Sequence, residues 1–277
     1  MADTSAGTSP GTVPPSQELT GPPLAELSLL ALVQNHTLDL PLAALFWALA
    51  ARRSSLIVAS PPRLAGKSTL LHAILDLQPP GCQFIATRGR DEDFGFLATS
   101  EPTRTTILVN EFSDHLPRYL WGEGVAQVFA ALAQGYSLGA TMHAATAEQV
   151  LSELAAAPNS VPPGHLGQLA AIVTIAMRRG ERGPVRRVET VALVEPPTTS
   201  SDLPPLQPLA RWDPKDDSFH LDGSAQGRAR TAARLGLAPA AWERELSRRG
   251  AALQALLERG VTEPDRVRRE AWRALPV

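Results

Sequence analysis

Cysteine, lysine and aromatic residues are scarce in this chain of 277 residues, and neither sign of charge dominates it. Cys82 is the single cysteine, which excludes a disulfide within the chain and is typical of a protein from a reducing compartment. The formal net charge is −2, so no overall basic field favours a nucleic-acid coat or a membrane-surface protein. No uninterrupted apolar run of about 18 residues predicts a spanning helix, and no signal-peptide pattern opens the chain. These absences predict a soluble, cytosolic protein.

Lysine is almost eliminated in favour of arginine. The chain has 24 arginines and only two lysines, Lys67 and Lys215. Because Lys67 stands in the string SPPRLAGKST, it is the first candidate for a functional residue.

Composition divides the chain into five segments. Residues 1–23 are mainly Ser, Thr, Gly and Pro, and we expect a disordered tail because such a segment cannot offset its ordering entropy by burial. Lead-in helices are predicted over 24–53, a core over 54–196, and a Pro-rich linker or extended segment over 197–224. The predicted C-terminal helical region, 225–277, is rich in arginine; its expected core is Trp242, Leu246, Leu253, Leu256 and Leu257.

Short apolar runs alternate with helical patterns in the predicted core. Strands are expected over 56–60, 83–87, 106–112 and 137–144, with a helix over about 117–134. Thr146 and Gln149 form a capping box that opens another helix. The stretches on either side of RGERGP predict an antiparallel hairpin that finishes the sheet. This alternation predicts an α/β fold with a mostly parallel sheet.

The string PPRLAGKS, residues 61–68, follows a predicted buried strand and precedes a predicted helix. In that context successive backbone N–H groups and the helix dipole converge on one point and form an anion site. Gly66 allows the backbone to approach a phosphate, Lys67 supplies a charge for the outer phosphates, and Ser68 offers a hydroxyl to Mg²⁺. The full pattern has Gly at the first position, where this chain has Pro61.

Two further polar residues follow predicted strands. Glu111 ends the apolar run TILVN and His143 ends the next one, so both side chains are expected at the carboxyl edge of the sheet, where ligands bind. We expect Glu111 to orient the attacking water and to act on the Mg²⁺ shell through water, and His143 to sense the terminal phosphate.

The strings SPPRLAGKSTLL, TILVNEFSDH and SLGATMHAATAEQVLSEL resemble the ATPases of type II and type IV secretion, type IV pilus and archaeal flagellum machines, most of all the tight-adherence pilus type. The resemblance covers roughly residues 24–277. It implies a RecA-like P-loop NTPase core with a small C-terminal helical region, ATP and Mg²⁺ as ligands, and Lys67, Glu111 and His143 as catalytic residues. The nucleotide-binding residues it implies are Pro62, Arg63, Leu64, Ala65, Gly66, Lys67, Ser68 and Thr69, with Ser68 on Mg²⁺.

The same resemblance implies partners and a location. Related ATPases work as homo-oligomers, typically a hexameric ring, beside an inner-membrane platform protein. We therefore expect a cytoplasmic chain, peripheral at the inner membrane, and no nucleic-acid partner, because the arginine-rich C-terminal region lacks interleaved aromatics.

Two alternatives to a hydrolysing motor stay open. Pro61, Leu64 and the lack of the family's acid-containing Asp box favour a degenerate subunit that binds nucleotide without turnover. A nucleic-acid translocase on the same fold is the other. The acidic segment 91–93 either replaces the missing acid or is a solvated turn, and Arg88, Arg90 and Arg104 are candidates to reach the nucleotide.

Overall fold

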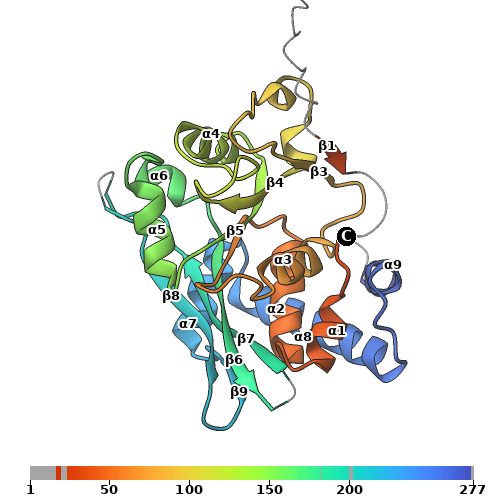
Figure 1. Ribbon diagram of the computed structural model, residues 1–277. Helices are drawn as coiled ribbons and strands as arrows, with labels where there is room; N and C mark the ends of the chain where they lie inside the picture. Colours follow the sequence, from red (N-terminus) through yellow and green to blue (C-terminus); the bar gives the residue numbers. More distant parts are fainter. Residues whose placement is uncertain (1–16, 20–23, 182, 200–201, 276–277) are drawn as a thin grey trace, which may run out of the picture.

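Nine strands form one sheet in the order β1-β3-β4-β5-β2-β6-β7-β8-β9 (Figure 1). The structure, a computed structural model, describes residues 17–19, 24–181, 183–199 and 202–275. Strands β3, β4, β5, β2 and β6 run parallel, and antiparallel strands extend both edges. Their bounds are β1 Gln17–Leu19, β2 Leu56–Ala59, β3 Gln83–Ala86, β4 Thr105–Phe112, β5 Ser137–Met142, β6 Ala171–Gly180, β7 Gly183–Val194, β8 Leu206–Asp213 and β9 Ser218–Leu221.

Helices cover both faces of the parallel part. One buried cluster joins α1, α2, α3 and the C-terminal helices to Leu56 and Val58, while a second joins α4, α5 and α6 to Ile57 and Ala59. Because these residues alternate along β2, the strand is buried on both sides, as its continuous apolar sequence predicts. The helices are α1 Leu29–Gln34, α2 Leu40–Ala50, α3 Lys67–Leu75, α4 Glu123–Leu132, α5 Ala147–Ala155, α6 Pro163–Leu166, α7 Ala225–Arg234, α8 Pro239–Glu258 and α9 Pro264–Ala274, with short 3₁₀ turns at Gly95–Ala98 and Pro102–Arg104.

The chain reverses direction across the sheet at β2. After β2 the chain crosses to β3 on one side, and after β5 it continues to β6 on the other side of β2. Such a switch point leaves a crevice outside the carboxyl ends of the strands. The mixed α/β fold is therefore confirmed, and the loop after β2 lies at the place where this topology favours a ligand.

The structure refines two sequence predictions about the periphery. Gln17–Leu19 pairs with β3, so the disordered tail expected over 1–23 does not include these residues; the rest of that segment up to residue 23 lies outside the described residues. The linker or extended segment expected over 197–224 contains β8 and β9, so much of it is extended chain that belongs to the sheet. Pro208 is tolerated in β8 because it lies at a register shift and β9 pairs only with Ala210–Asp213, beyond it.

The sequence predicts that the C-terminal helices form a region with its own core, but in the structure they share the core of the sheet domain. Trp242, Leu253 and Leu256 belong to the same buried cluster as Trp47 of α2, with Leu246 and Leu257 packed against it. The hydroxyl of Ser28 also donates to the carbonyl of Thr262 at 2.6 Å. Residues 225–275 therefore complete the core that begins at α1.

The capping box at the start of α5 is confirmed, with one change of partner. The Thr146 hydroxyl accepts from the Gln149 N–H at 3.2 Å, and the Gln149 side chain accepts from the Ala145 N–H at 2.8 Å. We expect Thr146→Ala to cost about 1 kcal/mol of unfolding free energy, a fall of about 2–4 °C in Tm. Thermal unfolding measures this, with Thr146→Ser as the matched control; equal losses in both variants would contradict the capping role.

Candidate functional site

The segment between β2 and α3 forms a tight loop whose first residue is anchored in the sheet. Ser60 is fully buried, and its hydroxyl donates to the carbonyl of Ile175 at 2.7 Å. Leu64 and Gly66 both have left-handed backbone conformations, with φ of 60° and 90°. Gly66 adopts this conformation without strain, and α3 begins at the next residue. The first backbone N–H groups of α3 have no partner inside the helix, so they face the loop as potential anion ligands.

A β-bulge near the end of β4 directs Glu111 into the site. Val109 pairs with Ala140 and Phe112 pairs with Met142, so two residues of β4 lie opposite the single residue Thr141. The Thr141 hydroxyl donates to the carbonyl of Asn110 at 2.6 Å and satisfies the irregular backbone there. Bulges of this kind re-aim a side chain and are common beside active sites.

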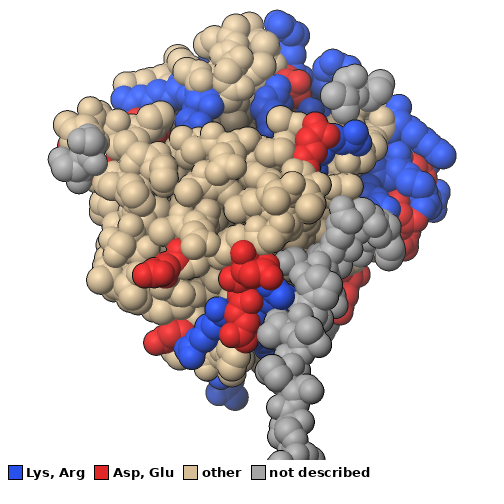
Figure 2. Space-filling view, turned by 90° about the horizontal axis from the view of Figure 1, so that it is seen from above, with Lys and Arg blue, Asp and Glu red and all other residues tan. Residues whose placement is uncertain are grey.

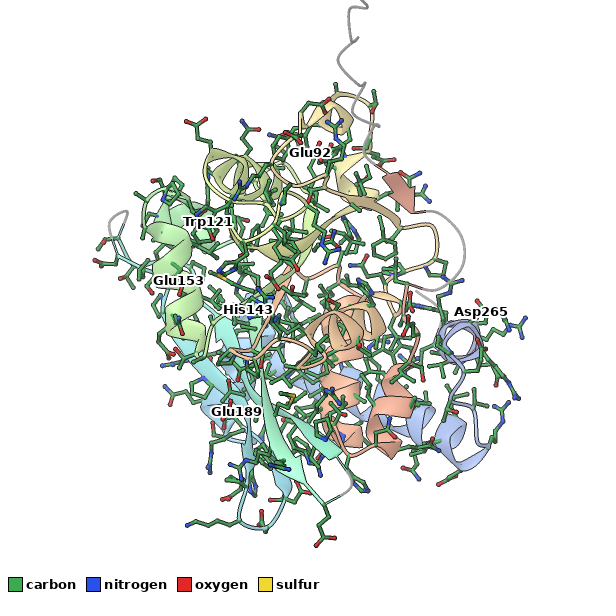
Figure 3. All side chains as sticks on the ribbon, in the orientation of Figure 1. Glu92, Trp121, His143, Glu153, Glu189 and Asp265 are labelled. Carbon is green, nitrogen blue, oxygen red and sulfur yellow. The ribbon has the colours of Figure 1, made fainter. Side chains whose placement is uncertain are left out.

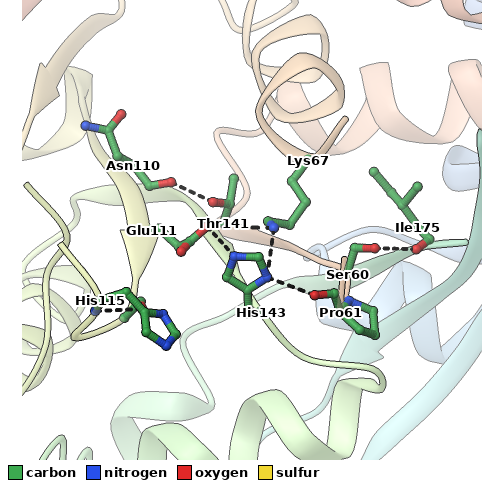
Figure 4. Close-up of polar contacts among 10 residues, drawn as sticks. Ser60, Pro61, Lys67, Asn110, Glu111, His115, Thr141, His143 and Ile175 are labelled. Atoms are coloured by element: carbon green, nitrogen blue, oxygen red, sulfur yellow. Dashed lines mark hydrogen bonds and ion pairs between the residues drawn. The ribbon is translucent and has the colours of Figure 1, made fainter. Parts of the chain in front are cut away.

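Lys67, Glu111 and His143 meet in one polar cluster (Figure 4). The Lys67 ammonium lies 3.7 Å from Glu111 Oε2 and 3.3 Å from His143 Nδ1, and His143 Nε2 lies 3.2 Å from the same Glu111 oxygen. His143 Nδ1 is also 3.1 Å from the carbonyl of Pro61. Nε2 is placed to donate to the Glu111 carboxylate, and Nδ1 can either accept from the Lys67 ammonium or donate to the Pro61 carbonyl, depending on the tautomer.

The charges of this cluster are largely withdrawn from water. Lys67 and Glu111 are 7% and 6% exposed. Burial lowers the pKa of the Lys67 ammonium below its ordinary value, Glu111 opposes that shift, and Arg63 adds to it. Glu111 Oε1 is buried without a hydrogen-bond partner, although Oε2 contacts both neighbours. An orphaned carboxylate oxygen is costly unless a ligand completes it, so the cluster is suited to receiving one.

The cluster opens into a cleft of about 1090 Å³. The cleft is lined by the phosphate-loop candidate, the turn after α1, strand β7 and the segment after β4. The predicted site residues that line it are Arg63, Leu64, Ala65, Gly66, Lys67, Ser68, Thr69, Glu111 and His143. The proline ring at position 61 does not separate these groups, since its carbonyl contacts His143.

The acidic segment 91–93 lies elsewhere. Glu92 is beside the loop before α4, far from His143 at the centre of the molecule (Figure 3). Its carboxylate accepts the N–H groups of Arg88 and Phe94 at 2.8 and 3.0 Å, and Asp93 pairs with Arg88 at 2.7 Å. Glu92 is therefore a loop-stabilising residue and not a solvated acid, and no residue of 83–93 lines the cleft.

The arginines that line the cleft are mostly not those expected. Arg90 donates to the carbonyl of Asp114 and Arg104 to that of Gly81, and neither these two nor Arg88 lines the cleft. Besides Arg63, the lining arginines are Arg118, Arg186 and Arg187. They come from the segment after β4 and from β7, whose approach to the loop depends on long-range pairing that no local sequence pattern reveals.

The charged surface gives no sign of a continuous basic face in the view from above. Arginine and lysine groups lie around a broad uncharged area and adjoin acidic groups in several places (Figure 2). Among the described residues, no helix combines the length and the apolar content required to cross a bilayer.

The fold and site thus define an open α/β sheet with a buried lysine, a carboxylate and an imidazole at its switch point. No family model matches the chain. An uncharacterized protein of Methanocaldococcus jannaschii is 26% identical over 225 residues, which cover 74% of this chain and 83% of the relative. The VirB11 ATPase of the Brucella suis type IV secretion system, solved in complex with sulphate, is similar with a TM-score of 0.36 and 16% identity. That match covers 62% of this chain and 64% of the VirB11 chain.

Proposed function

We propose that this protein binds Mg-ATP in the cleft and hydrolyses it, as an ATPase similar to those of secretion and pilus machines. The observation that carries the proposal is the convergence of Lys67, Glu111 and His143 within 3.2–3.7 Å of one another at the carboxyl ends of adjacent strands. The choice of ATP as the nucleotide, and of a secretion or pilus machine as the setting, comes from the resemblance of three sequence strings to those ATPases. The RecA-like P-loop character of the core is part of the same proposal.

The triphosphate has a suitable seat in the loop and the start of α3. The left-handed Gly66 and the first turn of the helix supply backbone donors, and Lys67 supplies a positive charge from the protein interior. Among the described residues, the Lys67 ammonium contacts the Glu111 carboxylate and the His143 ring. A phosphate is a stronger acceptor, so the Lys67 ammonium would bond to it instead, and the Glu111 carboxylate would then be available to bind water.

The residues present also fit a magnesium ion. Mg²⁺ prefers oxygen ligands, and the cleft offers the Ser68 hydroxyl and the orphaned Oε1 of Glu111, the latter reached through a water. When bound, the ion neutralises charge on the phosphate oxygens. Arg63, Leu64, Ala65 and Thr69, which line the cleft, would complete the nucleotide contacts, whereas Pro62 does not line it.

Glu111 and His143 are placed to act on the attacking water. Oε2 of Glu111 accepts from His143, so the carboxylate is held at a fixed position at the end of β4. It can accept a hydrogen bond from a water and orient the oxygen toward the terminal phosphorus. The water oxygen then bonds to phosphorus while its proton passes to the Glu111 carboxylate, and the bond to the bridging oxygen breaks. ADP and phosphate leave, and Glu111 returns the proton to solvent. His143, between Glu111 and the loop, is positioned to respond to the loss of the terminal phosphate.

A homo-oligomeric ring, an inner-membrane platform partner and a cytoplasmic location at that membrane are proposed from the sequence resemblance alone.

A second candidate function is a nucleotide-binding subunit without turnover. It is favoured by the absence of residues 83–93 from the cleft lining and by Pro61 and Leu64 in the loop.

Two measurements together test the proposal and separate the two candidates. We expect purified protein to bind ATP in the presence of Mg²⁺ in titration calorimetry and to release phosphate in a coupled assay. Binding without phosphate release would favour the second candidate. No binding of ATP at millimolar concentration would contradict both.

A further inference from the structure

Arg186 of β7 reaches across the cleft and holds the loop that precedes α3. Its Nε and Nη2 donate to the carbonyl of Leu64 at 3.3 and 3.0 Å. Arg186 pairs with Met177 of β6, and β6 pairs with β2, the strand that leads into the loop. The side chain therefore connects the loop to the same sheet from which the loop departs.

The loop backbone needs such support at this point. Leu64 has a φ of 60°, which is unfavourable for a residue with a branched side chain, and that side chain is 87% exposed. Packing of Leu64 therefore does not hold the conformation. Leu64 also occupies a position where many phosphate loops have Gly, so an external hydrogen bond to its carbonyl compensates for a strained residue.

The stem of Arg186 also covers Gly66. A Cβ placed on Gly66 would lie 3.2 Å from Cδ of Arg186. A residue other than glycine would be strained by the left-handed φ of 90° and would also require the Arg186 side chain to shift by a few tenths of an ångström. Arg186 thus touches the loop at two residues, Leu64 and Gly66, immediately before Lys67.

We propose that Arg186 is a positioning residue that clasps the loop in the left-handed conformation needed to receive the phosphates. It is supplied by the chain's own β6–β7 hairpin and lines the cleft. The role toward phosphates rests on the proposed function, whereas the clasp itself concerns the loop alone. Because Arg186 is bidentate to one carbonyl, we expect Lys to replace it in part and Gln poorly.

Trypsin cleavage without nucleotide tests the clasp directly, since the bond after Arg63 lies in the loop. We expect Arg186→Gln to accelerate cleavage at Arg63–Leu64 by about tenfold or more, because cleavage follows the population of the opened loop. Cleavage after Arg118, in an exposed segment, serves as the internal reference. The cleavage rate after Arg63 in Arg186→Lys is expected to lie between those of wild type and Arg186→Gln. Arg211→Gln, at an exposed position on β8, is the matched control.

Nucleotide affinity provides the second measurement. We expect Arg186→Gln to weaken Mg-ATP binding by about tenfold, with an unchanged Tm and partial recovery in Arg186→Lys. Unchanged cleavage after Arg63 would overturn the inference, and so would a parallel rise at Arg118, which would indicate general loosening. If wild-type protein binds no ATP but the Gln variant is still cleaved faster after Arg63, the clasp stands and the proposed function fails.

Discussion

Replacement of Lys67 by alanine is expected to weaken Mg-ATP binding by about 10- to 100-fold. Lys67 is the lysine that lines the cleft, and a hydrogen bond from its ammonium to a phosphate would contribute about 1.5–3 kcal/mol to the binding free energy. It emerges at the start of α3, where backbone donors add to its charge. Titration calorimetry with wild type and variant measures the change directly.

The chain offers an unusually well-matched control for this variant. Lys215 is the only other lysine, and it lies exposed in the turn between β8 and β9. Lys215→Ala removes the same charge and the same number of atoms, and we expect it to bind Mg-ATP like wild type. Equal affinity in the Lys67→Ala variant and the control would show that the nucleotide does not sit on this loop.

Replacement of Glu111 by glutamine is expected to lower kcat by about 100- to 1,000-fold while changing the Kd of Mg-ATP only a few-fold. The amide keeps the size of the side chain but not its ability to accept the proton of water. Loss in kcat with retained binding is the pattern of a group that acts on the reaction and not on the ground state. Phosphate release under saturating ATP measures it.

Glu181→Gln is the matched control, because Glu181 is exposed at the tip of the β6–β7 hairpin. Its kcat is expected to equal that of wild type. Should Glu111→Gln retain full turnover, another residue must orient the water, and His143 would be the next to replace. Should wild type itself show no turnover above the Glu111→Gln variant, the nucleotide-binding subunit is the better interpretation.

The parallel centre of the fold could be predicted because its signals are local. Strands buried on both faces are continuous apolar runs, and those at β2, β4 and β5 occur within a residue or two of their predicted ranges. The helix expected over 117–134 begins only at Glu123, since the segment before it turns back to β4. There the N–H of Leu120 donates to the carbonyl of Glu111 at 3.1 Å. β8 was not predicted as a strand because Pro208, together with Pro204 and Pro205 before it, resembles the proline pattern of a linker.

The sequence predicts which residues share the carboxyl edge of the sheet, but it does not predict the contacts that fix their positions there. Gly66 and Lys67 stand in one short string, and the rule that parallel strands end at one edge brings Glu111 and His143 beside them. Arg186 is distant in sequence from Leu64, and only the β6–β7 pairing places it at the loop. The β4 bulge that turns Glu111 inward likewise depends on the register with β5, which no pattern within β4 specifies.

The packing of α2 against α8 has a consequence for synthesis on the ribosome. Trp47 and its neighbours in α2 are fully buried in a cluster that includes Trp242 and Leu253. These partners are translated long after α2 has left the exit tunnel, so the part of the α2 surface that faces α8 stays uncovered while the sheet is being made. A nascent chain of this protein is therefore expected to depend on chaperones until its last helices emerge.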